Sequence, residues 1–263
     1  MAVPAHSPRV YRRRRQRIRR LLFFFLAITA LFYFIHSGIF SLENIVITGN
    51  DHIATAELEG LLGVTRGTNL WQLDTATLAR RLATHPLVAG AQVSRRWPHT
   101  LLVKIRERVP VALLVADGSF LLVDATGVVM ERVFQVGSLN LPLISGIDKL
   151  ENLGPGSRIE NPALAAALAV LQRVPAADLK QLREIVAPAP GNLQLIWAGQ
   201  IRVRFGDSQQ VAAKLDRLHE ALQGLPANSA IDYIDVSFAG PPVIKFTQAG
   251  NPAQGQAKKG VKQ

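Results

Sequence analysis

The side chains that could perform acid–base or metal chemistry do not group into a familiar catalytic pattern. The six histidines are isolated, with no i, i+4 pair and no HExxH motif: His6, His36, His52, His85, His99 and His219. A zinc site therefore has no support from the sequence. The sequence contains neither a G-x-S-x-G nucleophile motif nor a P-loop. In the Gly154-Pro155-Gly156 turn, the proline removes a backbone N–H that a bound anion would need.

Cysteine, acidic and aromatic residues add no catalytic site. The chain has no cysteine, which excludes disulfides, zinc–thiolate sites and thiol nucleophiles. Asp232 and Asp235 lie three positions apart in an expected strand, so we expect them on opposite faces. We expect Trp71, Trp97 and Trp197 to be core or hairpin anchors. We therefore predict a protein that is not an enzyme, with no catalytic residue, cofactor, metal or small-molecule substrate.

The net charge of +11 is concentrated at the two ends of the chain. Residues 1–20 contain eight arginines and no acidic residue, residues 249–263 contain three lysines, and the remainder is neutral. A nucleic-acid-binding globular domain would carry its basic residues on a folded face. We therefore expect no nucleic-acid partner, although a membrane-tethered nucleic-acid binder that uses the arginines remains an alternative.

Residues 21–40 contain no charged residue and predict a transmembrane helix. Twenty helical residues span roughly 30 Å, about the thickness of the hydrocarbon core of a bilayer. A cleaved signal peptide would have a shorter apolar core and a small-residue cleavage site. A twin-arginine export signal is the other alternative, because Arg19-Arg20 precedes the apolar run, but the run is longer and more hydrophobic than expected of such a signal. We expect His36 to lie near the outer interface.

The arginines before this segment predict its orientation, because basic flanks stay on the cytoplasmic side. The residues concerned are Arg12, Arg13, Arg14, Arg15, Arg17, Arg19 and Arg20. We therefore expect residues 1–20 to form a cytoplasmic tail, and everything after about residue 41 to lie across the membrane.

Residues 41–110 predict a small domain with the order β-α-α-β-β. Residues 42–48 alternate as a strand, Thr55 is expected to cap a helix that runs through Leu62, and Asp74 is expected to begin a second helix that stops before Pro86. Residues 88–97 and 100–109 then read as a hairpin. This order resembles a POTRA domain, a periplasmic module that holds other polypeptides.

Residues 111–248 predict a β-rich domain with packed helices, so the overall fold class is α+β. We expect a hairpin at 120–124 and 128–133, a short strand or loop at 141–146 and strands at 193–197 and 201–205. Helices are expected at 163–174 and from Ser208 to Gln223. Residues 249–263 have no apolar face and are expected to be disordered.

The last two expected strands, 232–238 and 243–246, suggest a binding edge. If VIKF at 243–246 is the final strand, one of its sides has no partner within the chain. An unpaired edge invites a strand from another protein. Two alternatives stay open here: VIKF could pair on both sides, or Lys245 could protect the edge from aggregation.

The complete order of segments resembles the FtsQ/DivIB family of bacterial cell-division proteins. The resemblance covers residues 12–247 and rests on SLENIVITGN at 41–50, NLWQLD at 69–74, RRWPHTLLVKIRERVPVA at 95–112, FLLVDATGVV at 120–129, LPLISG at 141–146 and DYIDVSF at 232–238. The segment from Trp97-Pro98 to Ala112 is the most specific of these, because a generic POTRA domain would not need it.

This resemblance implies a non-enzymatic scaffold of the divisome in the inner membrane at the division septum. Its implied partners are FtsB and FtsL, together with the septal peptidoglycan synthase pair FtsW and FtsI and the divisome protein FtsK. The resemblance places the FtsB contact, made by β-strand addition, on Tyr233, Asp235, Ser237, Phe238, Gly240, Lys245 and Phe246. The alternative function is a POTRA-containing component of periplasmic transport or outer-membrane biogenesis.

Overall fold

The computed structural model describes residues 8–116, 118–136, 139–148, 150, 152–225 and 230–247, with side chains from residue 18 onward. The expected disordered tail at 249–263 and the first seven residues of the basic tail lie outside the described residues. The chain forms two compact units. One contains the residues up to Glu107 except 85–87, and the other contains 85–87 and the residues from Arg108 onward.

The chain begins with one long helix, α1 (Pro8–Ile35), followed by a short 3-10 helix, η1 (Gly38–Phe40). The segment Ile18–Phe40 has a mean hydropathy of 2.0 and is long enough to cross a membrane. Most of its large apolar side chains are exposed, as expected of a helix surrounded by lipid. The helical part of the apolar run ends at Ile35, so His36 lies just beyond the last turn.

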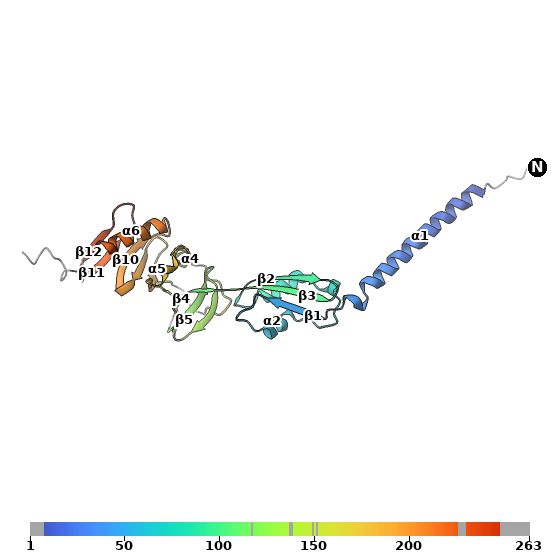
Figure 1. Ribbon diagram of the computed structural model, residues 1–263, viewed down its shortest axis with the longest axis horizontal. Coiled ribbons are helices and arrows are strands. Elements are labelled where there is room, and N and C mark those ends of the chain that lie inside the picture. The colour runs from blue at the N-terminus through green and yellow to red at the C-terminus, as the bar shows by residue number, and fades with distance from the viewer. Residues whose placement is uncertain are drawn as a thin grey trace, which may run out of the picture. The chain divides into compact units, whose positions relative to one another are not determined.

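The first unit contains a three-stranded sheet of order β1-β3-β2. The strands β1 and β3 are parallel, and β2 and β3 form the expected antiparallel hairpin. Its elements are β1 (Asn44–Thr48), α2 (Thr55–Leu62), η2 (Leu70–Gln72), α3 (Thr75–Leu82), β2 (Val88–Arg96) and β3 (Thr100–Glu107). The expected β-α-α-β-β order is confirmed (Figure 1).

The helices α2 and α3 begin differently. The side chain of Asp74 accepts hydrogen bonds from the backbone N–H groups of Ala76 and Thr77, so it caps α3 as expected. The expectation that Thr55 caps α2 is wrong. Thr55 is already the first helical residue, the N-cap is Ala54, and the Thr55 hydroxyl instead accepts a hydrogen bond from Asn50 Nδ2.

The second unit contains a nine-stranded sheet of order β12-β11-β10-β9-β8-β7-β4-β5-β6. The strands on the β6 side are β4 (Pro110–Ala116), β5 (Ser119–Asp124), β6 (Val129–Val133) and β7 (Leu143–Ser145). The remaining elements are α4 (Pro162–Leu171), α5 (Ala176–Leu179), β8 (Glu184–Val186), β9 (Leu193–Trp197), η3 (Ala198–Gln200), β10 (Ile201–Gly206), α6 (Val211–Gln223), β11 (Ile231–Asp235) and β12 (Val243–Phe246). Apolar residues of α4 and α6 pack with those of the sheet in one core.

Several local expectations need correction. The helix α6 begins at Val211 rather than Ser208, because the backbone at Gln210 is left-handed (φ 49°) and breaks the helical path. The helix α4 begins at Pro162, capped by Asn161, and ends at Leu171. Of the tryptophans, expected in the core or as hairpin anchors, Trp197 is buried in the core and Trp97 lies in the β2–β3 turn, whereas Trp71 belongs to η2 and is about half exposed.

Glu107, the last residue of β3, and Arg108, the next residue, form their side-chain hydrogen bonds within different units. In the first unit, the Glu107 carboxylate accepts hydrogen bonds from the backbone N–H groups of His52 and Ile53. In the second unit, Arg108 donates to the Asp124 carboxylate at 2.5 Å. The side chains of Arg108 and Asp124 are 16% and 7% exposed, so this ion pair is largely withdrawn from water.

Asp124 also organises the turn between β5 and β6. Its carboxylate accepts hydrogen bonds from the backbone N–H groups of Thr126 and Val128. Burial alone would raise the pKa of Asp124. The hydrogen bonds from the Val128 N–H, from Arg108 and from Thr126 outweigh that effect and hold the pKa below its ordinary value.

We expect Asp124→Asn to lower the free energy of unfolding by about 3 kcal/mol, because it leaves Arg108 buried without its counter-charge. A depressed native pKa contributes stability that is present above the unfolded-state pKa and is lost as the pH falls through the native pKa. The difference in free energy of unfolding between wild type and Asp124→Asn should therefore shrink in acid. Urea denaturation across a pH series would measure it.

The control for this prediction is Glu131→Gln, which changes an exposed carboxylate on the neighbouring strand β6. It should leave the free energy of unfolding within about 0.5 kcal/mol of wild type. A difference between wild type and Asp124→Asn that stays constant from neutral to acidic pH would contradict the role given to the ionised carboxylate.

Candidate partner-binding site

The strand β12 lies at one end of the nine-stranded sheet. It pairs with β11 on one side, and no strand among the described residues pairs with its other side. The alternative that VIKF pairs on both sides therefore does not hold for the part of the chain that the structure describes. A free edge of this kind presents backbone donors and acceptors to solvent.

The outward-facing backbone groups of β12 belong to Ile244 and Phe246. The N–H of Thr247, directly after the strand, donates to the Ala230 carbonyl on the β11 side at 2.9 Å. Backbone groups alternate in direction along an antiparallel strand. Lys245 and Val243 therefore share the inward direction of Thr247, and Ile244 and Phe246 point to the free side.

A depression of about 170 Å³ lies on one face of the sheet beside this edge. It is lined by residues of β9, β10, β11 and β12: Gln194, Arg202, Arg204, Asp232, Tyr233 and Lys245. The opposite face of β10 and β11 contributes Val203, Phe205 and Ile234 to the core under α6. Alternation along β10 thus directs Arg202 and Arg204 to the solvent face.

The charged groups of this depression surround one tyrosine. The Arg204 guanidinium carbon lies 3.8 Å from the centroid of the Tyr233 ring, and Lys245 Nζ lies 5.4 Å from it. Asp232 forms ion pairs with Arg202 at 2.5 Å and with Lys245 at 3.0 Å. Three cationic side chains face one carboxylate, so the depression carries excess positive charge.

A β-bulge explains why neighbouring residues of β11 line the same depression. Ile231 pairs with Phe246 and Tyr233 pairs with Lys245, which leaves Asp232 as the extra residue. The bulge turns Asp232 to the face occupied by Tyr233. The expectation that Asp232 and Asp235 face opposite sides is therefore wrong, because strict alternation fails at Asp232.

The pKa of Asp232 is lowered from its ordinary value. The main cause is the hydrogen bond from Lys245. Desolvation opposes it, and the charges of Lys245 and Arg202 lower the pKa further. The carboxylate is consequently ionised at neutral pH and holds the two cations beside the strand edge.

The turn between β11 and β12 contains the other residues suggested by the sequence. Asp235 accepts hydrogen bonds from the backbone N–H and the hydroxyl of Ser237, which closes the turn after β11. The Phe238 side chain is 44% exposed. Gly240 has a φ of 147° and lies close to the Phe238 ring, so the turn requires glycine there.

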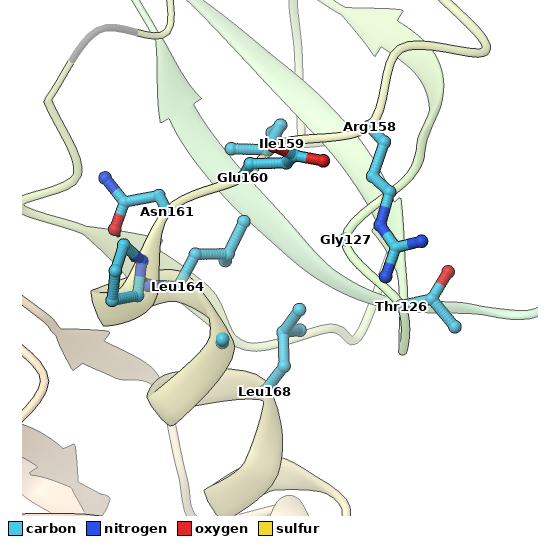
Figure 2. Close-up of a pocket in the computed structure, with 10 residues that line it drawn as sticks. Thr126, Gly127, Arg158, Ile159, Glu160, Asn161, Leu164 and Leu168 are labelled. Carbon is cyan, nitrogen blue, oxygen red and sulfur yellow. Dashed lines mark hydrogen bonds between the residues drawn. The ribbon is translucent and has the colours of Figure 1, made fainter.

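A second depression, of about 340 Å³, lies beside the N-terminus of α4 (Figure 2). It is formed by the β5–β6 turn, the segment 158–161 and α4. Asn161 Oδ1 already accepts hydrogen bonds from the N–H groups of Ala163 and Leu164. Those helix N-terminal donors are therefore occupied, and the described residues contain no group of three or more metal-ligating side chains there or elsewhere.

Family models match both units of the chain. The model of the FtsQ-type POTRA domain matches residues 40–108, and the C-terminal model of cell-division protein FtsQ/DivIB matches residues 112–237. The chain is 30% identical over 200 residues to cell division protein FtsQ of Myxococcus fulvus, covering 74% of this chain and 70% of that protein. The chain belongs to the FtsQ/DivIB family.

Other members of the FtsQ/DivIB family are also similar to this chain. FtsQ of Anaeromyxobacter sp. is 36% identical over 198 residues, covering 73% of this chain and 65% of the relative. DivIB of Geobacillus kaustophilus is 24% identical over 229 residues, covering 85% and 82%. The solved extracytoplasmic domain of DivIB from Geobacillus stearothermophilus matches with a TM-score of 0.33 and 20% identity, covering 46% of this chain and 97% of that chain. The FtsQ/DivIB match makes this chain a cell-division protein.

The structure brings together some of the residues that the FtsQ/DivIB resemblance suggested. Tyr233 and Lys245 line the depression and Phe246 belongs to the edge strand. Asp235 ends β11, and Ser237, Phe238 and Gly240 lie in the adjoining turn. Sequence reasoning missed Arg202, Arg204 and Asp232. The strand-helix-strand order of β10, α6 and β11 could have indicated the first two, because such a unit usually pairs its strands in parallel.

We expect Lys245→Met to raise the pKa of Asp232 toward its ordinary value, because the substitution removes both the hydrogen bond and the charge that lower the pKa most. An NMR titration of the Asp232 carboxylate would measure the shift. Arg202→Met should produce a smaller rise, and Lys104→Met, which alters an exposed lysine of β3, should produce none. An unchanged pKa in Lys245→Met would rule out the described ion pair.

Proposed function

We propose that this chain is a non-enzymatic scaffold of the divisome, which binds FtsB and FtsL and helps to recruit and regulate septal peptidoglycan synthesis. Its further partners in this proposal are FtsW, FtsI and FtsK. The observation that carries the proposal is the free edge of β12 beside a cationic depression, in a chain of the FtsQ/DivIB family. The relatives named above are all cell-division proteins, which favours this function over the transport alternative.

The proposal places the chain in the inner membrane at the septum, with α1 as its single span. The N-terminus is cytoplasmic and both folded units are periplasmic. The arginines at 12–15, 17, 19 and 20 precede the apolar segment Ile18–Phe40 or lie at its start, and basic flanks remain on the cytoplasmic side. The domain limits follow the same scheme: tail 1–20, span 21–40, POTRA domain 41–110, C-terminal domain 111–248 and tail 249–263.

The binding mode is addition of an FtsB strand to β12. The outward backbone groups of Ile244 and Phe246 would pair with the incoming strand, so its affinity would depend little on its exact side chains. The depression beside the edge supplies specificity. Because Arg202 and Arg204 outnumber Asp232 as charges there, an acidic side chain on the incoming strand would fit it.

We expect Ile244→Pro to weaken FtsB binding at least about tenfold relative to Ile244→Ala, a difference of about 1.4 kcal/mol. Both variants lose the isoleucine side chain, but only proline removes the outward N–H and places its ring in the path of the partner strand. Calorimetry with the purified extracytoplasmic segment of FtsB would measure the two dissociation constants.

The inward hydrogen bonds of β12 belong to its neighbouring residues, so both Ile244 variants should unfold at similar temperatures. This comparison separates loss of binding from loss of the fold. Equal affinities of Ile244→Pro and Ile244→Ala for FtsB would exclude strand addition at this edge.

We expect at least one of Phe238→Ala and Phe246→Ala to weaken FtsB binding by more than about 1 kcal/mol, as for an aromatic anchor at an interface. Phe238 is exposed in the turn, and Phe246 lies on the edge strand. The matched control is Phe134→Ala, since Phe134 is 75% exposed just after β6, at the other end of the sheet. Wild-type affinity in both of the first two variants would mean that the site lies elsewhere.

A further inference from the structure

Three aromatic rings of the first unit form a cluster that its core does not use. Phe40, Trp71 and Trp97 come from η1, η2 and the β2–β3 turn. The centroids of the Trp71 and Trp97 rings are 4.5 Å apart, and the Phe40 ring meets them edge-on at 6.1 and 5.5 Å. Trp71 is nonetheless 50% exposed and Trp97 44% exposed. We refer to these three residues as the aromatic cluster.

Hydrogen bonds hold the aromatic cluster in place. Arg95 Nε donates to the Leu70 carbonyl at 2.7 Å, and the same guanidinium donates to the Leu73 carbonyl. These bonds fix the η2 segment, which carries Trp71, beside the β2–β3 turn. The Asn69 side-chain oxygen accepts a hydrogen bond from the backbone N–H of Trp71 at 2.9 Å. These hydrogen bonds fix the backbone that carries the aromatic cluster, so the exposed rings form a defined apolar surface.

The aromatic cluster is continuous with the membrane-spanning segment. Phe40 is the last residue of the apolar segment Ile18–Phe40. Its ring packs edge-on against Phe34 of α1, with centroids 5.3 Å apart. Asn69 Nδ2 also donates to the carbonyl of Ile35, the last residue of α1, at 2.8 Å. Asn69 therefore links the C-terminal end of α1 to the η2 segment that carries Trp71.

We propose that the aromatic cluster is a lipid-binding surface, which sits in the headgroup region of the leaflet where α1 ends. Tryptophan is enriched at membrane–water interfaces because its ring is apolar while its indole N–H remains hydrogen-bonded. Ile39 is 58% exposed beside Phe40 and extends the apolar surface. Arg96 is exposed next to Trp97, where a guanidinium can pair with a lipid phosphate.

This surface gives the first unit a second attachment to the bilayer. A single helix allows a domain to pivot at the point where the helix ends. Aromatic residues from η2 and the β2–β3 turn, inserted beside it, would oppose that movement. The proposal depends on α1 being embedded in lipid and is independent of FtsB binding.

The test measures tryptophan fluorescence of the full chain in vesicles of phosphatidylethanolamine and phosphatidylglycerol. The signal of Trp71 and Trp97 is the difference between wild type and the double variant Trp71→Phe/Trp97→Phe. That double variant retains Trp197, which is 1% exposed and serves as an internal background. We expect lipids brominated near the headgroup end of their acyl chains to reduce the difference signal at least about twofold, as for residues of an interfacial aromatic belt.

Iodide, present both inside and outside the vesicles, measures the exposure of the same tryptophans to water. The difference signal should resist this aqueous quencher, and the Trp197 background should respond weakly to both quenchers. Quenching by iodide without quenching by brominated lipid would place the cluster in water and overturn the proposal. Resistance to both quenchers would also overturn it, because the cluster would then be covered by protein.

Discussion

The candidate binding site depends on the outward backbone groups of Ile244 and Phe246, which have no strand partner among the described residues. An open sheet ends in edge strands, and on the outer side of an edge strand the backbone N–H and C=O groups lack strand partners. Here that strand has only four residues, Val243–Phe246, and it carries a lysine at its centre. Short length and charge both oppose uncontrolled edge-to-edge association. Lys245 can therefore protect the edge and, through Asp232, also shape the depression beside it.

The junction between the two units explains why the segment after β3 is so distinctive in sequence. Glu107 accepts hydrogen bonds from the loop before α2, and Arg108, the next residue, pairs with Asp124 at the β5–β6 turn. The buried ion pair requires the exact combination of Arg108 with the aspartate of FLLVD at 120–124, so two distant sequence segments are fixed together.

The elements with a clear hydrophobic period could be predicted from the sequence, and the features that depend on non-local pairing could not. The apolar run of α1, the β2–β3 hairpin and the β5–β6 hairpin follow from local patterns. The strand β8, with three residues, has no pattern of its own and exists because β7 and β9 flank it. The bulge at Asp232 likewise depends on the register between β11 and β12.

The same distinction applies to the candidate site. The strand patterns at 232–238 and 243–246 could indicate that Tyr233 and Lys245 belong to terminal strands. The depression also needs Arg202 and Arg204 from β10, which reach it through the parallel pairing of β10 with β11. Backbone pairing at an edge tolerates side-chain changes, whereas a cationic depression selects charge. A site with both parts can keep its binding geometry while its individual anchors differ among relatives. In the candidate site, the edge strand follows from a local sequence pattern, whereas the charged side chains beside it meet only through non-local strand pairing.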